Sequence, residues 1–256
     1  MVAQRVTVGG VRDLPGVLYP GQKPPHLLDA SDREKPAKLA DFFVDVGLPV
    51  EQVRELVPIG SQVVIQRELL EIGNTVSCKA MDNRVSVYVM IEAMRRTTRA
   101  GFEVIATATV QEEVGLRGAL PNAFDVAPDV GLAIDITLAS DFPGIPKQEQ
   151  ITQLGGGAAI KIMDSASISS PKVVQALKTL AAQREIPYQM EILPRGGTDA
   201  GAMQRVRSGV PVGTISIPTR YVHTSCEMAA KSDIEAAIAL TAAFIEEGHT
   251  FDFMPE

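Results

Sequence analysis

Two patterns of hydrophobic and polar residues divide the chain. Over the first part, short apolar and β-branched stretches are separated by turns rich in proline and glycine. Strands are expected at residues 5–8, 16–19, 42–46 and 62–67, and one helix at residues 50–57. Short strands at this spacing predict a small barrel or sandwich. We therefore predict a β-rich domain over residues 1–75, which ends at the turn formed by Gly73 and Asn74.

From residue 76 onward, predicted strands alternate with predicted helices. The strands are expected at residues 76–79, 103–110, 130–137, 160–163, 188–193 and 212–217, and the helices at residues 82–99, 171–183, 199–208 and 232–247. This alternation indicates an α/β layer sandwich around a largely parallel sheet. We predict that residues 76–256 form this second, larger domain.

Composition and charge narrow the possible partners. Hydrophobic residues make up 45% of the chain and charged residues 21%, as in ordinary globular proteins. The net charge of −7 argues against nucleic acid or an anionic membrane as the main partner. No apolar run approaches the roughly 20 residues that span a bilayer. Two cysteines, Cys78 and Cys226, are too few for a disulfide framework, so we expect a cytoplasmic protein.

Acidic residues and one histidine stand at the ends of predicted elements. Glu112 and Glu113 follow the strand expected at 103–110, and Asp82 opens the helix that follows the strand at 76–79. Asp135 lies near the end of another strand, and His223 follows the last one. Sites in open α/β sheets gather outside the carboxyl ends of the strands, so we expect these side chains to converge.

Each of these residues also has a structural interpretation. The adjacent glutamates are compatible with a solvated strand end, Asp82 with a helix N-cap, and His223 with a loop histidine. Asp135 is the most informative, because a carboxylate between two isoleucines in an apolar strand is costly unless it is paired or binds a cation. Taken together, several carboxylates and a histidine at one edge are typical of a two-metal hydrolase.

The motifs around these residues resemble those of a known enzyme family. They are Lys79-Ala-Met-Asp-Asn-Arg84, Val110-Gln-Glu-Glu-Val-Gly-Leu-Arg-Gly118, Ala133-Ile-Asp-Ile-Thr137, Pro194-Arg-Gly-Gly-Thr-Asp-Ala200 and Ile217-Pro-Thr-Arg-Tyr-Val-His-Thr224. In order and spacing they are similar to the co-catalytic metallo-aminopeptidases, the deblocking and glutamyl aminopeptidases that form tetrahedral particles and include members labelled endoglucanases. The resemblance implies a three-layer α/β/α zinc-peptidase-like catalytic domain. Pro15-Gly-Val and Lys23-Pro-Pro-His-Leu-Leu resemble the small β-rich dimerisation domain that this family inserts into it.

The resemblance also implies a role for each matching residue in the metal site. Asp82 would bridge two divalent metal ions, and Glu113 would bind one of them only. Asp135 would be a terminal ligand of one ion and His223 of the other. Glu112 would be the general base that deprotonates the attacking water. Carboxylates with imidazole suit zinc or cobalt, and two such ions activate water and polarise the scissile carbonyl.

The reaction implied is the removal of N-terminal residues from peptides, inside a homo-oligomer that is a dodecamer built from dimers. Thr198 and Asp199 would lie close to the substrate. A related deacylase of N-acyl amino acids is the alternative enzyme, and a non-catalytic assembly subunit is the alternative outside enzymes. A cellulase is disfavoured, because a chain with no Trp and 4 Tyr lacks the aromatic platforms that bind sugars.

The chain departs from the family pattern in one respect. The family carries a His-x-Asp motif with a further metal ligand in a segment before the inserted domain, and this sequence has no such segment. His26, after a Pro-Pro turn, and His249, in the tail, are not expected to replace it. We expect an N-terminally truncated member that holds its second ion poorly, because ligand count and geometry set occupancy.

The run Gly155-Gly-Gly157 lacks the Lys-Ser/Thr of a phosphate-binding loop, so nucleotide binding is not expected there. The resemblance places this run in a loop near the active site, where a close approach of the backbone to the substrate is plausible. Ser225 and Cys226 are near His223 in the sequence only, and such neighbours are seldom its catalytic partners.

Overall fold

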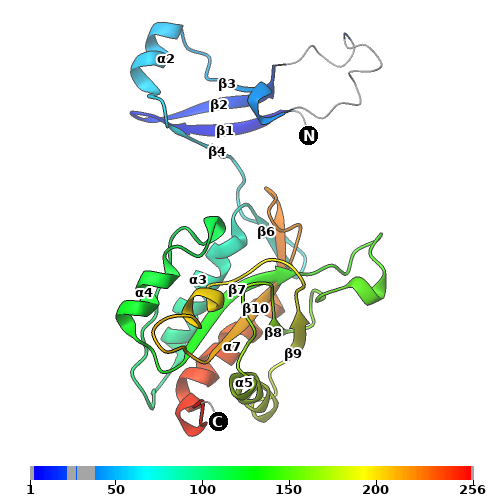
Figure 1. The fold of residues 1–256 in the computed structure, drawn as a ribbon. Coiled ribbons are helices and arrows are strands. Elements are labelled where there is room, and N and C mark those ends of the chain that lie inside the picture. Colours follow the sequence, from blue (N-terminus) through cyan, green and yellow to red (C-terminus); the bar gives the residue numbers. More distant parts are fainter. Residues whose placement is uncertain (1–2, 22–26, 28–37, 255–256) are drawn as a thin grey trace. The chain divides into compact units, whose positions relative to one another are not determined.

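The structure is a computed structural model that describes residues 3–21, 27 and 38–254. The chain divides into two compact units, unit 1 at Met1–Glu68 and unit 2 at Leu69–Glu256 (Figure 1). The division comes before residue 75, because β5 (Leu70–Ile72) and β6 (Thr75–Cys78) pair across the predicted turn and belong to the sheet of unit 2. His26 and most of the motif around it lie outside the described residues.

Unit 1 is an antiparallel sheet, and its predicted strands are confirmed. The strands are β1 (Gln4–Gly9), β2 (Asp13–Pro20), β3 (Phe42–Asp45) and β4 (Gln62–Ile65), in the order β3-β2-β1-β4, with helix α2 at Val50–Leu56 and a 3-10 turn at Leu39–Asp41. The apolar side chains of Val6, Val8 and Leu14 are buried. The prediction of a barrel or sandwich was wrong for the described residues, because β3 and β4 lie at the two ends of a single sheet and do not pair with each other.

Unit 2 is built on a seven-stranded sheet. Besides β5 and β6 it contains β7 (Gly131–Leu138), β8 (Ala158–Met163), β9 (Tyr188–Ile192), β10 (Val212–Arg220) and β11 (Glu227–Ala230). The order is β5-β6-β11-β10-β8-β9, and β7 pairs with β10. Strands β5 and β11 were not predicted, and β11 follows β10 through a turn.

The sheet is mixed, so the prediction of a largely parallel sheet was wrong. β7 is parallel to β10 and β8 to β9, whereas β8 and β11 are antiparallel to β10. β6 is also antiparallel to β11, so β6, β7 and β10 all run in one direction. These three strands precede or carry predicted site residues, and their carboxyl ends therefore lie at the same edge.

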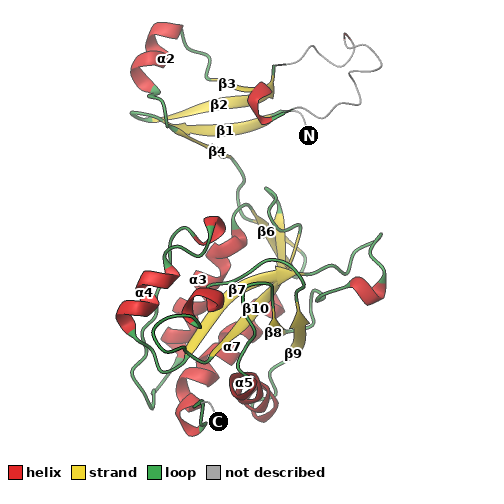
Figure 2. Ribbon diagram, in the orientation of Figure 1, coloured by secondary structure: helices red, strands yellow, loops and turns green. Residues whose placement is uncertain are grey.

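Helices cover both faces of this sheet, as the three-layer prediction requires (Figure 2). They are α3 (Met81–Arg96), α4 (Ala119–Val126), α5 (Pro171–Gln183), α6 (Ala200–Met203) and α7 (Lys231–Glu247). Ile134 and Ile136 of β7 pack into the main core with α3, α5 and α7, whereas Ala133 packs with Ala200 of α6 and Val212. Successive strand residues point to opposite faces, so the two groups of helices lie on opposite sides. Within the described residues, no helix is long and apolar enough to cross a membrane.

The strand expected at residues 103–110 does not form. The segment has β-branched residues, but it bonds to no neighbouring strand of the described chain and has no regular structure. A β pattern becomes a strand only where another edge offers hydrogen bonds. The two glutamates therefore lie in a 3-10 turn, Glu112–Val114, preceded by Gln111 in the left-handed region at φ 58°.

Candidate metal centre

Three separate loops bring predicted ligands to one point. Asp82 lies in the first turn of α3 after β6, Glu113 in the 3-10 turn, and His223 in the turn between β10 and β11. One ligand atom from each residue lies within 4.8 Å of the others. The His223 Nε2 atom is 3.2 Å from Asp82 Oδ2 and 3.6 Å from Glu113 Oε2. The predicted convergence of these three residues is thus present in the structure.

The cluster is buried at its base and open at its rim. The Asp82 side chain is 11% exposed, against 69% for His223 and 58% for Glu113. Asp82 does not cap its helix, because the N-cap residue is Ala80 and no side chain makes a capping bond. An open rim above a buried carboxylate leaves access for a ligand from solvent.

Burial and the repulsion between carboxylates both act on Asp82. Burial, followed by the negative charges of Glu113 and Glu227, raises the pKa of Asp82 to about 6. A divalent ion among these oxygens would offset both the repulsion and the cost of burial. Carboxylate oxygens with an imidazole nitrogen form a donor set that suits such an ion, so the residues present fit a metal.

Glu112 belongs to the same electrostatic neighbourhood. Burial, followed by the charges of Glu113, Asp199 and Asp82 in that order of importance, raises the pKa of its carboxyl to about 7. His223 acts in the opposite direction. A carboxyl group whose pKa lies near neutrality is suited to exchange protons with a reacting group.

Asp135 lies in β7 beneath the cluster but outside the group of three ligand atoms. Its Oδ1 accepts hydrogen bonds from Asn83 Nδ2 at 2.9 Å and from the Ile136 amide at 2.7 Å. Burial raises the pKa of Asp135 well above its usual range, and the charge of Asp82 adds to the shift. Its hydrogen bonds satisfy part of the carboxylate, and its role as a metal ligand stays a prediction.

Thr198 and Asp199 differ in their surroundings. Thr198 is buried, and its hydroxyl donates to Asp164 Oδ2 at 3.4 Å. Asp199 is half-buried and accepts a hydrogen bond from the Thr109 hydroxyl, while its other oxygen is buried and has no partner among the described residues. The charge of Asp199 acts on Glu112, which places Asp199 beside the cluster. Contact of either residue with a substrate stays a prediction.

Comparison with known proteins decides the family. A family model described as M42 glutamyl aminopeptidase matches residues 1–240. The chain belongs to the M42 glutamyl aminopeptidase family. Peptidases of this family are metal-dependent, in agreement with the donor set described above. The sequence-based resemblance is confirmed.

Individual relatives of this M42 chain give the same result. Aminopeptidase APDkam598 from the archaeon Desulfurococcus kamchatkensis has a solved structure with a TM-score of 0.89 and 42% identity, over 95% of this chain and 68% of that one. The Pyrococcus horikoshii TET1 peptidase, described as assembling into a tetrahedron or a large octahedral shell, has a TM-score of 0.81 and 29% identity, over 95% and 72% of the two chains. An inferred aminopeptidase of Acetivibrio thermocellus is 39% identical over 207 residues, which are 80% of this chain. The match spans only 62% of that relative's length.

One residue of the M42 site was missed by the sequence reasoning. Glu227, at the start of β11, accepts hydrogen bonds from the backbone amides of both Asp82 and His223. It stands four residues after His223, but nothing in its local sequence indicates that its second partner is Asp82.

The structure also shows the surroundings of His249 and of the glycine run, two features considered in the sequence analysis. His249 lies against Phe102, with ring centroids 6.4 Å apart, and is not part of the ligand cluster. A Cβ atom on Gly157 would lie 2.2 Å from the Pro187 carbonyl oxygen, so the close approach at this glycine is to the Pro187 backbone. Gly157 therefore has a structural reason to lack a side chain, and the approach of this loop to a substrate stays a prediction.

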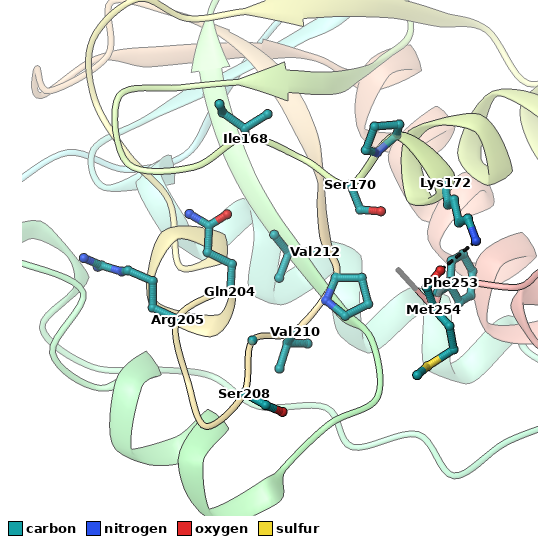
Figure 3. A pocket seen from close by; sticks show the side chains of 13 residues that line it. Ile168, Ser170, Lys172, Gln204, Arg205, Ser208, Val210, Val212, Phe253 and Met254 are labelled. Carbon is teal, nitrogen blue, oxygen red and sulfur yellow. Dashed lines mark hydrogen bonds between the residues drawn. The ribbon is translucent and has the colours of Figure 1, made fainter. Parts of the chain in front are cut away.

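A cavity of about 790 Å³ lies apart from the cluster (Figure 3). Its lining includes Val212, the first residue of β10, and Ser170 just before α5, whereas His223 follows the other end of β10. Lys172 reaches across its edge and donates to the Met254 carbonyl at 2.6 Å. This cavity is therefore separate from the metal cluster.

Proposed function

We propose that this chain is a metal-dependent aminopeptidase that hydrolyses N-terminal residues from peptides. The observation that carries the proposal is the convergence of Asp82, Glu113 and His223 within 4.8 Å, beside Glu112, in a chain of the M42 family. Peptide hydrolysis needs a polarised carbonyl, an activated water and a group that moves a proton. The cluster offers residues for each of these tasks.

We propose that two divalent ions, zinc or cobalt, are held at the cluster. As the resemblance implies, Asp82 would bridge them and Glu113 would bind one of them only. Asp135 would be a terminal ligand of one ion and His223 of the other. Such ions, when bound, lower the pKa of water and polarise the scissile carbonyl. The low exposure of Asp82 and the open positions of Glu113 and His223 suit ions that also contact a substrate.

The proton-transfer step falls to Glu112. Its carboxylate would accept the proton of the attacking water and later deliver a proton to the leaving amine. A pKa of about 7 places it near the optimum for such exchange at neutral pH. The negative charge of Asp199 acts on Glu112, and in this place it would also attract the positively charged amino terminus of a peptide.

We further propose that the chain works as a homo-oligomer, a dodecamer built from dimers, with unit 1 as the dimerisation domain. Support comes from the tetrahedral assembly described for the Pyrococcus horikoshii TET1 peptidase. A cytoplasmic location stays a prediction from cysteine usage.

The test measures metal content and hydrolysis of a panel of aminoacyl-p-nitroanilides by the purified chain with added zinc or cobalt. We expect turnover by the wild type and a loss of about 10²- to 10⁴-fold in Glu112→Gln, with metal content retained. Glu149→Gln, which changes an exposed glutamate in a distant 3-10 turn, is the matched control and should remain active.

Other outcomes favour the alternatives. Hydrolysis of N-acyl amino acids but not of the anilides would indicate the deacylase. Bound metal without turnover on either substrate, or no metal at all, would contradict the peptidase and favour the assembly subunit.

A further inference from the structure

Glu227 joins two parts of the sheet that carry metal ligands. It is the first residue of β11 and pairs with Cys78 at the end of β6, from which the chain continues to Asp82. The next residue, Met228, pairs with Arg220 at the end of β10, from which the chain continues to His223. Glu227 is only 2% exposed, so its side chain lies beneath both loops.

Each carboxylate oxygen of Glu227 has one backbone partner. Oε2 accepts from the Asp82 amide at 3.0 Å, and Oε1 accepts from the His223 amide at 2.8 Å. These two amides belong to residues far apart in sequence whose side chains meet at 3.2 Å. A single carboxylate therefore connects the main chains of two ligands of the cluster.

The backbone of His223 needs such support. Its φ is 61°, in the left-handed region that costs a residue other than glycine about 1–2 kcal/mol. A charge-assisted hydrogen bond to its amide is among the stronger bonds available to hold this conformation. The bond to Glu227 thus favours the backbone conformation from which the imidazole reaches Asp82.

General stabilisation alone is a poor account of Glu227. A buried carboxylate is costly in an apolar environment, and in the described part of the chain no Lys or Arg forms an ion pair with it. An apolar residue would fill the same volume without a buried charge, but it would leave the Asp82 and His223 amides without their acceptor. The buried charge of Glu227 is explained if it favours a cation at the cluster and orients the residues that bind the cation.

We propose that Glu227 is a positioning residue that sets the spacing and orientation of Asp82 and His223 for metal binding. This role rests on the proposed metal-dependent function, and it depends on the two hydrogen bonds that the Glu227 carboxylate accepts.

Asp233 provides a matched control within the same unit. It is also buried, and its two carboxylate oxygens accept from the backbone amides of Gly155 at 2.8 Å and Gly157 at 2.9 Å. Its Oδ1 also accepts from the Ser232 hydroxyl at 3.4 Å, and none of its partners is a ligand of the cluster. Substitution of Asp233 or of Glu227 therefore removes hydrogen bonds from backbone amides to a buried carboxylate. Only in Glu227 do these bonds hold residues of the cluster.

The first measurement is amide hydrogen exchange in the metal-free protein. In the wild type we expect the Asp82 and His223 amides to be protected. Glu227→Gln keeps the volume of the side chain but replaces one acceptor oxygen by a donor, so it should release at least one of the two amides. Asp233→Asn should leave both protected. Equal protection of both amides in wild type and Glu227→Gln would contradict the bonding itself.

The second measurement is a titration with Co²⁺, which gives the Kd and the visible absorption spectrum of the bound ion. Changes in groups that orient metal ligands typically cost 10- to 100-fold in affinity, so we expect the Kd of Glu227→Gln to rise by about this factor and its spectrum to change. Asp233→Asn should bind as the wild type does, even if both variants lose similar thermal stability. An unchanged Kd and spectrum in Glu227→Gln would overturn the positioning role.

The two measurements separate the two proposals. A wild type that binds no Co²⁺ contradicts the proposed function, and the metal-free exchange rates still decide whether Glu227 holds the two amides. A wild type that binds Co²⁺ and a Glu227→Gln variant that binds equally well contradict only the positioning role.

Discussion

Lys161 and Glu191 form an ion pair in which both side chains are completely buried. They stand opposite each other on the parallel strands β8 and β9. The Glu191 Oε1 atom also accepts a hydrogen bond from the Thr137 hydroxyl at 2.6 Å. Thr137 lies two residues after Asp135 on β7 and so on the same face of the sheet. Buried polar side chains therefore extend from the ion pair through Thr137 to Asp135 on the same face of β7.

Breaking this pair should destabilise unit 2 strongly. Lys161→Met leaves the Glu191 carboxylate buried without its cation, which typically costs about 3–5 kcal/mol in the free energy of unfolding. The double variant Lys161→Met/Glu191→Leu removes both charges and should recover part of the loss. Recovery should be incomplete, because buried Asp164, whose Oδ2 lies 3.9 Å from Lys161 Nζ, also loses its cation. Urea denaturation of the wild type, both single variants and the double variant measures the coupling. Additive effects of the two single substitutions would show that the side chains do not depend on each other.

Two glycines of one loop should differ in their tolerance of alanine. Gly155 has φ +77° and no atom within 4 Å of the position that a Cβ would take, whereas Gly157 has φ +88° and the Pro187 oxygen at 2.2 Å from that position. Gly155→Ala should therefore cost only the backbone strain, about 1–2 kcal/mol. Gly157→Ala should cost more, because the backbone must also move. Thermal unfolding of both variants is the measurement, and equal losses would rule out the steric contribution at Gly157.

Metal should stabilise the chain through His223 and not through His249. A ligand present at 100 times its Kd adds about 2.7 kcal/mol to the stability of the form that binds it. For a unit of this size that is roughly 5–10 °C in Tm. We expect zinc or cobalt to raise the Tm of the wild type and of His249→Ala, but to raise that of His223→Ala much less. A full shift in His223→Ala, measured by differential scanning fluorimetry, would exclude His223 as a ligand.

The pair Asp141–Arg220 should make stability depend on pH in the acidic range. Arg220 donates to both carboxylate oxygens of Asp141, at 2.7 and 2.8 Å, and these bonds lower the pKa of Asp141 below its usual value. The folded state therefore binds the proton less tightly than the unfolded state. The stabilisation is complete above the unfolded pKa of about 4 and is lost as the pH falls through the lower folded value.

The measurement is urea denaturation of the wild type and Asp141→Asn between about pH 3 and pH 7. We expect a difference in unfolding free energy of up to about 1 kcal/mol near neutrality, which shrinks toward the acid end. Asp129→Asn, at an exposed position, controls for the loss of one negative charge. A difference between wild type and Asp141→Asn that stays constant with pH would exclude the ion pair as its cause.

Local sequence patterns were sufficient to predict elements that are defined mainly by their buried apolar side chains. The apolar alternation in β7 and the helical periodicity of α5 and α7 gave boundaries close to the structure. Residues 103–110 carry an equally clear β pattern and form no strand. The side chains of a segment show by their apolar pattern that the segment is buried. Whether it pairs as a strand depends on a second strand, whose free edge comes from another part of the chain.

The same distinction applies to the candidate site. Residue type and position at predicted element ends were enough to single out Asp82, Glu112, Glu113, Asp135 and His223 as a set. The structure brings ligand atoms of Asp82, Glu113 and His223 within 4.8 Å of one another. That they meet depends on β6, β7 and β10 sharing a direction inside a mixed sheet, which no local pattern encodes.

The sequence by itself thus determined the layered α/β class, the family and the residue types of the candidate metal centre. Only the tertiary structure decided the strand order, the 3-10 turn of Glu112 and Glu113, and the place of Glu227. The physical reason is separation along the chain. The Glu227 carboxylate bonds to an amide 145 residues away, and a bond of that kind exists only after the sheet has brought the two loops together.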